Sequence, residues 1–158
     1  MKLKLQDLYD AHARHVAEVN DWYDEKGKMP LYRAFVRAEQ LLRLDVLIAQ
    51  YQDKFATTWE PVIGRVAINH LLFSKTSREP DQVEKVRKIA FPDIFFLLHE
   101  DLVNVEIPSG TLELLDSVKQ SQEYLRHYTE RYPIELPPCS ENEWDHLLSM
   151  KHQVKRKQ

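Results

Sequence analysis

The sequence predicts an all-α protein, a single compact domain of about six or seven helices that begins with an antiparallel helical hairpin. Apolar residues recur at three- and four-residue spacing in six separate segments, and capping residues precede several of them. The 158 residues include only three glycines, and no glycine-rich pattern of a phosphate- or nucleotide-binding loop occurs. The length suits one domain with its own hydrophobic core.

The hairpin is predicted over residues 1–52. Gly27 ends its first helix, and Pro30 is placed to open the second, because proline fits the first helical position. A short turn between two long helices favours an antiparallel pair. The two apolar stripes include Leu5, Leu8, Val16, Tyr23, Phe35, Ala38 and Leu42.

Central helices are predicted over residues 57–131. Thr57 or Thr58 caps the first of them, and Pro80 opens a short charged helix. The stretch from Ile94 to Leu102 is apolar on nearly all sides, which is typical of a helix at the centre of a domain. The residues expected in the middle of the core are Phe95, Leu98 and Leu102.

The last third of the chain contains several breaks. Residues 103–107 alternate apolar and polar side chains, and we expect an extended exit there before a helix capped by Thr111. Residues 133–139 form a proline-rich connector. Ser140 to Glu143 then fit a capping box, which predicts a C-terminal helix with a basic tail over residues 140–157.

The composition excludes several classes of protein. A hydrophobic share of 43% and a charged share of 30% are ordinary for a globular domain, and a net charge of −3 gives no general attraction to nucleic acid or anionic lipid. The single cysteine, Cys139, excludes an internal disulfide and a multi-thiolate zinc site. The longest apolar run is too short to span a bilayer, and the N-terminus lacks a signal-peptide core. We therefore expect a cytoplasmic protein without membrane contact, metal or cofactor.

One motif has catalytic potential. Arg65-Val66-Ala67-Ile68-Asn69-His70 places an arginine and a histidine five positions apart on a predicted helix. The spacing is similar to the R-x4–6-H motif of the HEPN ribonucleases, compact helical proteins that usually dimerise. The resemblance implies that His70 transfers the 2′-hydroxyl proton while Arg65 stabilises the negative charge of the phosphorane. The alternative is that Arg65 pairs with a carboxylate and His70 packs at a helix boundary, which leaves no catalytic residues.

An aromatic and cationic cluster surrounds the first turn. Its members are Trp22, Tyr23, Tyr32, Arg33 and Arg37. Tryptophan, tyrosine and arginine dominate protein-binding hot spots, so the cluster is a candidate partner-binding site. The alternative is that these side chains pack the closed end of the hairpin.

Two sets of residues have metal-ligand spacing. His12, His15 and Glu18 share one side of the first helix, and Glu143 with His146 forms one Glu-x-x-His pair. Each set lacks the further ligands that a metal site needs, so we predict no metal.

The basic tail is a candidate nucleic-acid contact, through Lys151, Lys155, Arg156 and Lys157. The same cations also interact favourably with the dipole at a helix C-terminus without any ligand. The prediction for the whole chain is a non-enzymatic binding or regulatory protein with another protein as its partner, and a homodimer as a variant of this. The alternatives are a HEPN-like ribonuclease, or its inactive relative, and a nucleic-acid-binding regulator that uses the tail.

Overall fold

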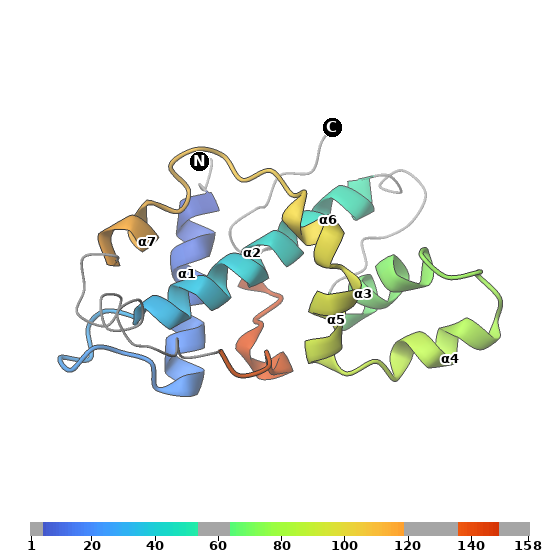
Figure 1. Cartoon of the computed structure of the whole chain (residues 1–158), viewed down its shortest axis with the longest axis horizontal. Helices are drawn as coiled ribbons and strands as arrows, with labels where there is room; N and C mark the ends of the chain where they lie inside the picture. The colour runs from blue at the N-terminus through green and yellow to red at the C-terminus, as the bar shows by residue number, and fades with distance from the viewer. Residues whose placement is uncertain (1–4, 54–63, 119–135, 149–158) are drawn as a thin grey trace, which may run out of the picture.

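The computed structural model describes residues 5–53, 64–118 and 136–148 (Figure 1). Within these ranges the chain forms seven α-helices and a short 3-10 helix, with no β-strand, so the predicted all-α class is confirmed. The elements are α1 (Leu5–Asn20), α2 (Tyr32–Asp53), α3 (Gly64–Phe73), α4 (Asp81–Arg87), α5 (Phe91–Leu97), α6 (His99–Val103), α7 (Glu113–Val118) and η1 (Glu141–Glu143). None of the described helices combines the length and apolar character required to cross a membrane.

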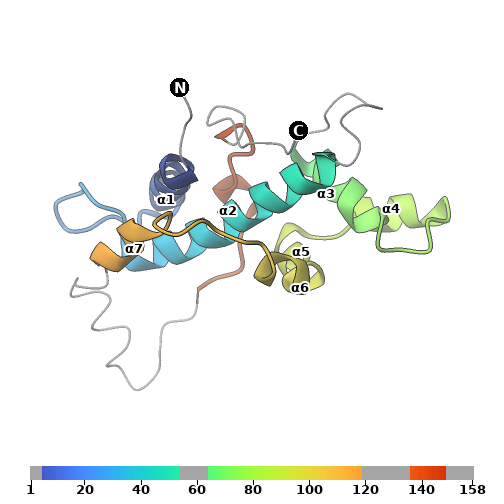
Figure 2. The same ribbon diagram turned by 90° about the horizontal axis from the view of Figure 1, so that it is seen from above.

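The helices α1 and α2 pack closely, as the predicted hairpin requires. The first helix does not run to Gly27 as predicted, because α1 ends at Asn20, and Gly27 lies in the connection to α2 with a left-handed φ of 66°. Pro30 does not open the second helix. It forms an isolated antiparallel bridge with Tyr23, and α2 begins at Tyr32. The helices cross rather than lie side by side along their full length (Figures 1 and 2).

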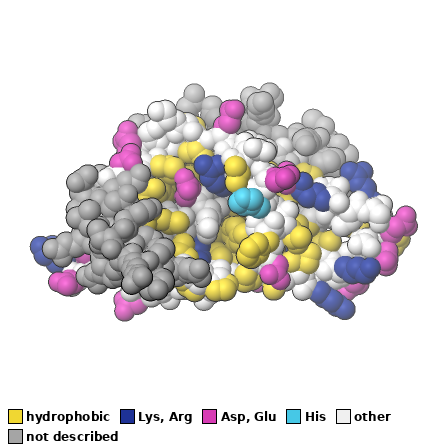
Figure 3. Space-filling model, viewed as in Figure 1, with side chains coloured by type: hydrophobic (Ala, Val, Ile, Leu, Met, Phe, Trp, Pro, Cys, Tyr) yellow, Lys and Arg dark blue, Asp and Glu magenta, His cyan; other side chains and the backbone are white. Residues whose placement is uncertain are grey.

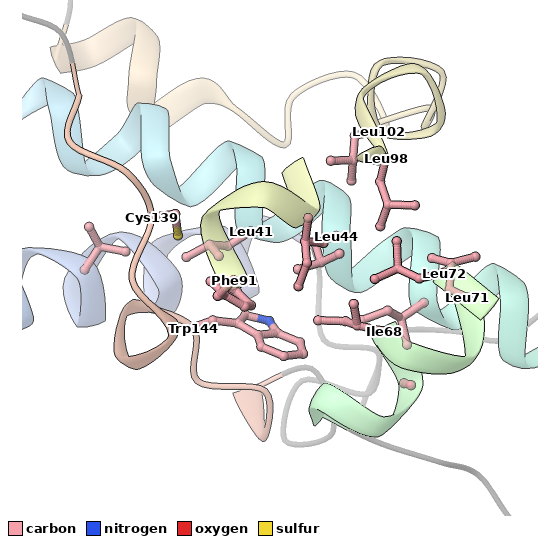
Figure 4. Close-up of a cluster of buried hydrophobic side chains, with 14 of the residues drawn as sticks. Leu41, Leu44, Ile68, Leu71, Leu72, Phe91, Leu98, Leu102, Cys139 and Trp144 are labelled. Atoms are coloured by element: carbon pink, nitrogen blue, oxygen red, sulfur yellow. The ribbon is translucent and has the colours of Figure 1, made fainter. Parts of the chain in front are cut away.

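The helix α2 is the central element, because both hydrophobic clusters use it. One cluster packs α2 against α1 and α7, and there the ring of Tyr9 meets that of Phe35 edge-on at 5.7 Å. The Tyr9 hydroxyl donates to the Phe35 carbonyl at 3.1 Å, and burial raises the pKa of this phenol. The other cluster packs α2 against α3, α5, α6 and the side chain of Trp144 (Figure 4).

The apolar stretch after residue 90 differs from the prediction. It forms two short helices, α5 and α6, that meet at Leu98 with φ −101° and ψ 12°. Leu98 and Leu102 are buried in the core as predicted, and Phe95 is partly buried at its edge. The prediction that this stretch is buried on nearly all sides is wrong, because Phe96 and Val103 are exposed. These helices pack against the rest of the domain on one side only, so only one apolar stripe is covered.

Replacing Leu98 by alanine is expected to lower the free energy of unfolding by about 2–5 kcal/mol, because it removes a fully buried side chain and leaves a cavity. Urea denaturation monitored by circular dichroism measures the loss. Leu97→Ala is the matched control on the exposed side and should change stability by less than about 0.5 kcal/mol. Equal losses for the two variants would contradict this orientation of α5.

The C-terminal segment (136–148) also departs from its prediction. The capping box is present, with Ser140 and Glu143 reciprocally bonded, but it closes one 3-10 turn rather than opening a long helix at Ser140. The backbone of Trp144 is extended, with φ −101° and ψ 102°, and its side chain packs in the core. Residues 149–158, the rest of the predicted helix, lie outside the described residues.

Candidate functional site

A buried ion pair joins the C-terminal segment to the hairpin. Arg37 on α2 and Glu143 on η1 are 2% and 1% exposed. Arg37 Nη1 donates to both carboxylate oxygens of Glu143 at 2.7 Å, and Arg37 Nη2 donates to the carbonyl of Pro137. Glu143 also accepts from the Ser140 amide at 2.6 Å and from Asn20 Nδ2 at 2.8 Å. The carboxylate is therefore bonded by α1, α2 and its own turn, which offsets part of its desolvation.

A second buried pair lies further along α2. His12 Nε2 lies 2.5 Å from Asp45 Oδ2, and Trp144 Nε1 donates to Asp45 Oδ1 at 3.0 Å. All three side chains are buried, so neither the imidazole nor the carboxylate is accessible to a substrate. These contacts tie α1, α2 and the C-terminal segment together, and we assign them a structural role.

Cys139 lies beside the Arg37–Glu143 pair. Burial raises the pKa of its thiol to about 12, although the nearby Arg37 charge acts in the opposite direction. A thiol is a weak nucleophile until it loses its proton. Cys139 is consequently a packing residue rather than a reactive one.

In the aromatic and cationic cluster around the first turn, which is the candidate partner-binding site, some side chains are buried and others are half-buried. Arg37 and Tyr32 are buried, so neither can serve as an exposed contact residue. Trp22 and Tyr23 are half-buried against the core, and the Arg33 guanidinium lies 5.8 Å from the centre of the Trp22 ring. Tyr32 packs in the cluster between α1, α2 and α7, whereas Arg37 is bonded to the C-terminal segment. The sequence could not reveal this, because the partner of Arg37 lies 106 positions away.

The two residues of the ribonuclease-like motif have different environments. Arg65 Nε donates to Asn69 Oδ1 at 2.9 Å, Arg65 Nη2 donates to the carbonyl of Ile89, and Nη1 lies 4.0 Å from Glu141. His70 is exposed and lines two surface grooves, and Arg65 lines neither of them. Arg65 thus connects α3 to the turn before α5 and to η1.

The residues with metal-ligand spacing do not converge. His12 is bonded to Asp45, whereas His15 Nε2 lies 2.9 Å from the carbonyl oxygen of Asn142. Glu143 forms an ion pair with Arg37. In the described part of the chain, no group of three or more histidine, cysteine, aspartate or glutamate side chains is arranged to hold a metal ion. The tail residues Lys151, Lys155, Arg156 and Lys157 lie outside the described residues.

An exposed apolar face on α5 and α6 is the surface feature that sequence reasoning missed. Phe96 is 82% exposed, Leu97 54% and Val103 60%. Hydrophobic side chains gather over α5 on the face of the molecule drawn in Figure 3. Asp93 and Glu100 are also exposed, each three or four positions from Phe96 and Leu97. We call the side chains of Phe96, Leu97 and Val103 the α5–α6 apolar face.

The sequence contains only an ambiguous signal for this face. Phe95, Phe96, Leu97 and Leu98 follow one another, and periodicity cannot separate buried from exposed members of a continuous apolar run. The opposite side is well packed, since Phe91 stacks on Trp144 with ring centres 5.7 Å apart, and Ile94 and Leu98 are fully buried. The helix therefore holds its exposed side in a defined position.

Comparison of the chain with protein-family models, with curated proteins and with solved structures finds no match.

Proposed function

We propose that this chain is a non-enzymatic binding or regulatory protein of the cytoplasm, and that it binds another protein through the α5–α6 apolar face. The observation that carries the proposal is the 82% exposure of Phe96, with Leu97 exposed next to it in the chain on α5 and Val103 exposed on α6. Single exposed apolar residues are normal on soluble proteins, but contiguous apolar surface is typical of interaction sites.

Docking on this face has a clear energetic basis. Full burial of one phenylalanine side chain contributes about 1.5–3 kcal/mol, and large aromatic residues are frequent hot spots. The backbone under Phe96 is already ordered by the buried residues Ile94 and Leu98 on the opposite side of α5. Little conformational entropy is then lost on association, which favours affinity.

The charges around the face indicate the chemistry of the partner. Asp93 and Glu100 are exposed next to Phe96, so the matching surface is an apolar pocket bordered by lysine or arginine. A symmetric dimer would bring the same patch of two copies together, and with it these carboxylates. Like charges in a contact are costly, so a different, basic protein is favoured over a second copy.

The ribonuclease alternative and the nucleic-acid-binding alternative have less support. Arg65 is bonded to Asn69 and to the Ile89 carbonyl, which restricts it as a catalytic group. A nucleic-acid contact would depend on cations after residue 150, outside the described residues.

The test begins by identifying the partner at a defined position. A photoreactive amino acid at position 96 is used to crosslink the full chain in extract of its native host, and the captured protein is purified. Its affinity is then measured by calorimetry for the wild type, for Phe96→Ala and for Leu147→Ala, a control with an exposed leucine on the C-terminal segment.

Phe96→Ala is expected to weaken this affinity at least about tenfold, with an unchanged melting temperature, because the side chain contacts the partner and not the core. Leu147→Ala should bind like the wild type. Equal affinities for Phe96→Ala and the wild type would refute the proposed face. A concentration-dependent dimer in sedimentation that Phe96→Ala abolishes would instead make a second copy the occupant.

A further inference from the structure

A second surface lies on another part of the molecule, where the C-terminal half of α2 meets the end of α3, the turn after it and the end of α6. It is a groove of about 740 Å³, within the size range of small-molecule sites. The groove is independent of the α5–α6 apolar face, since neither Phe96 nor Leu97 lines it. Its walls carry polar and charged side chains, and its apolar residues are Leu47, Leu71, Phe73 and Val105.

The backbone carbonyls at the end of α3 are already hydrogen-bonded. The Ser74 amide donates to the His70 carbonyl at 3.0 Å, and the Ser74 hydroxyl donates to the Leu71 carbonyl at 2.6 Å. The amide and hydroxyl of Thr76 both donate to the Phe73 carbonyl, at 3.0 and 2.8 Å. The helix end therefore presents few unused acceptors to a ligand, and its negative dipole end is partly compensated.

The side chains of the groove are instead rich in donors. Lys75 Nζ lies 2.7 Å from Asp101 Oδ2, so these two charges compensate each other. Arg78 is a second cation, and among the described residues its guanidinium has no ion pair, so one positive charge remains in excess. Gln50 and Asn104 each add an amide donor and a carbonyl acceptor. The excess positive charge favours a negatively charged ligand.

We infer that this groove binds a small organic anion in which a phosphate or carboxylate is joined to an apolar body. Arg78 would take the anionic group, and the apolar body would lie against Leu71, Phe73 and Val105. A concave surface that combines apolar side chains with a few charged and polar groups can hold both parts of such a ligand. Nothing in this assignment depends on the proposed protein-binding face.

The test uses phenyl phosphate as the probe, titrated into the isotopically labelled full chain and followed by nuclear magnetic resonance. We expect saturable shifts at groove residues, including His70 and Asn104, with millimolar or tighter affinity. Inorganic phosphate and phenol should each bind more weakly, because each lacks one half of the ligand. Benzoate in a parallel titration separates a preference for carboxylate from one for phosphate.

Arg78→Gln is expected to raise the dissociation constant of phenyl phosphate about tenfold, through loss of a charge-assisted hydrogen bond. Arg14→Gln on α1 is the matched control, because Arg14 is an exposed arginine outside the groove, and it should leave affinity unchanged. The spectra of both variants verify that they are folded. The inference is overturned if shifts do not saturate, if they lie outside the groove, if Arg78→Gln binds like the wild type, or if phenol binds as tightly as phenyl phosphate.

Discussion

Replacing Arg37 by methionine is expected to lower the free energy of unfolding by about 3–5 kcal/mol, because it leaves the Glu143 carboxylate buried without its cation. The loss is measured by urea denaturation of the full chain, with circular dichroism and tryptophan fluorescence as separate probes. Arg14→Met is the matched control at an exposed ion pair with Asp10 and should cost less than about 1 kcal/mol.

A double substitution tests whether the buried charge itself is responsible. Glu143→Gln removes the charge and keeps one of the two oxygens, which can still accept either from Asn20 or from the Ser140 amide. We therefore expect Arg37→Met with Glu143→Gln to be more stable than Arg37→Met alone, since the uncompensated carboxylate is gone. If the single variant loses less than about 1 kcal/mol, or the double variant is less stable than the single, the ion pair does not hold the C-terminal segment in place.

Trp144→Ala is expected to cost about 3–5 kcal/mol, because it removes a large buried ring that stacks on Phe91 and leaves a cavity between α2 and α5. Trp144→Phe retains a ring against Phe91 but removes the donor to Asp45 Oδ1, so a smaller loss of about 1–3 kcal/mol is expected.

Hydrogen exchange provides the local readout for these variants. Amides of the C-terminal segment should lose protection in Trp144→Ala before those of α1 and α2, because that segment is attached through Trp144 and Glu143. Leu147→Ala, at an exposed site on the same segment, should leave both stability and protection unchanged. Unaltered protection of the segment in Trp144→Ala would show that it is held by other contacts.

Local sequence signals were sufficient for the helical class and for most of the helices, but not for all of their bounds. The stripe that includes Leu8 and Val16 predicts α1, and Gly27 marks its turn, because helix periodicity and positive φ depend on residues a few positions apart. The capping box at Ser140 was also identified correctly, but it closes a 3-10 turn, and helical backbone resumes only at Leu148, the last described residue of the segment. The turn ends at Trp144, whose backbone is extended and whose ring packs against Phe91, a residue 53 positions earlier in the chain.

The candidate surfaces depended on tertiary structure. The sequence pattern left open whether Arg37 contacts a partner or packs the closed end of the hairpin, and only Glu143, 106 positions away, allows that guanidinium to be buried. Likewise, Phe96 and Leu98 are equally apolar, and their difference arises because α5 packs on one side only. Helix formation is largely encoded by near neighbours in the sequence, whereas the burial of a charge or an apolar side chain depends on what the rest of the chain places beside it.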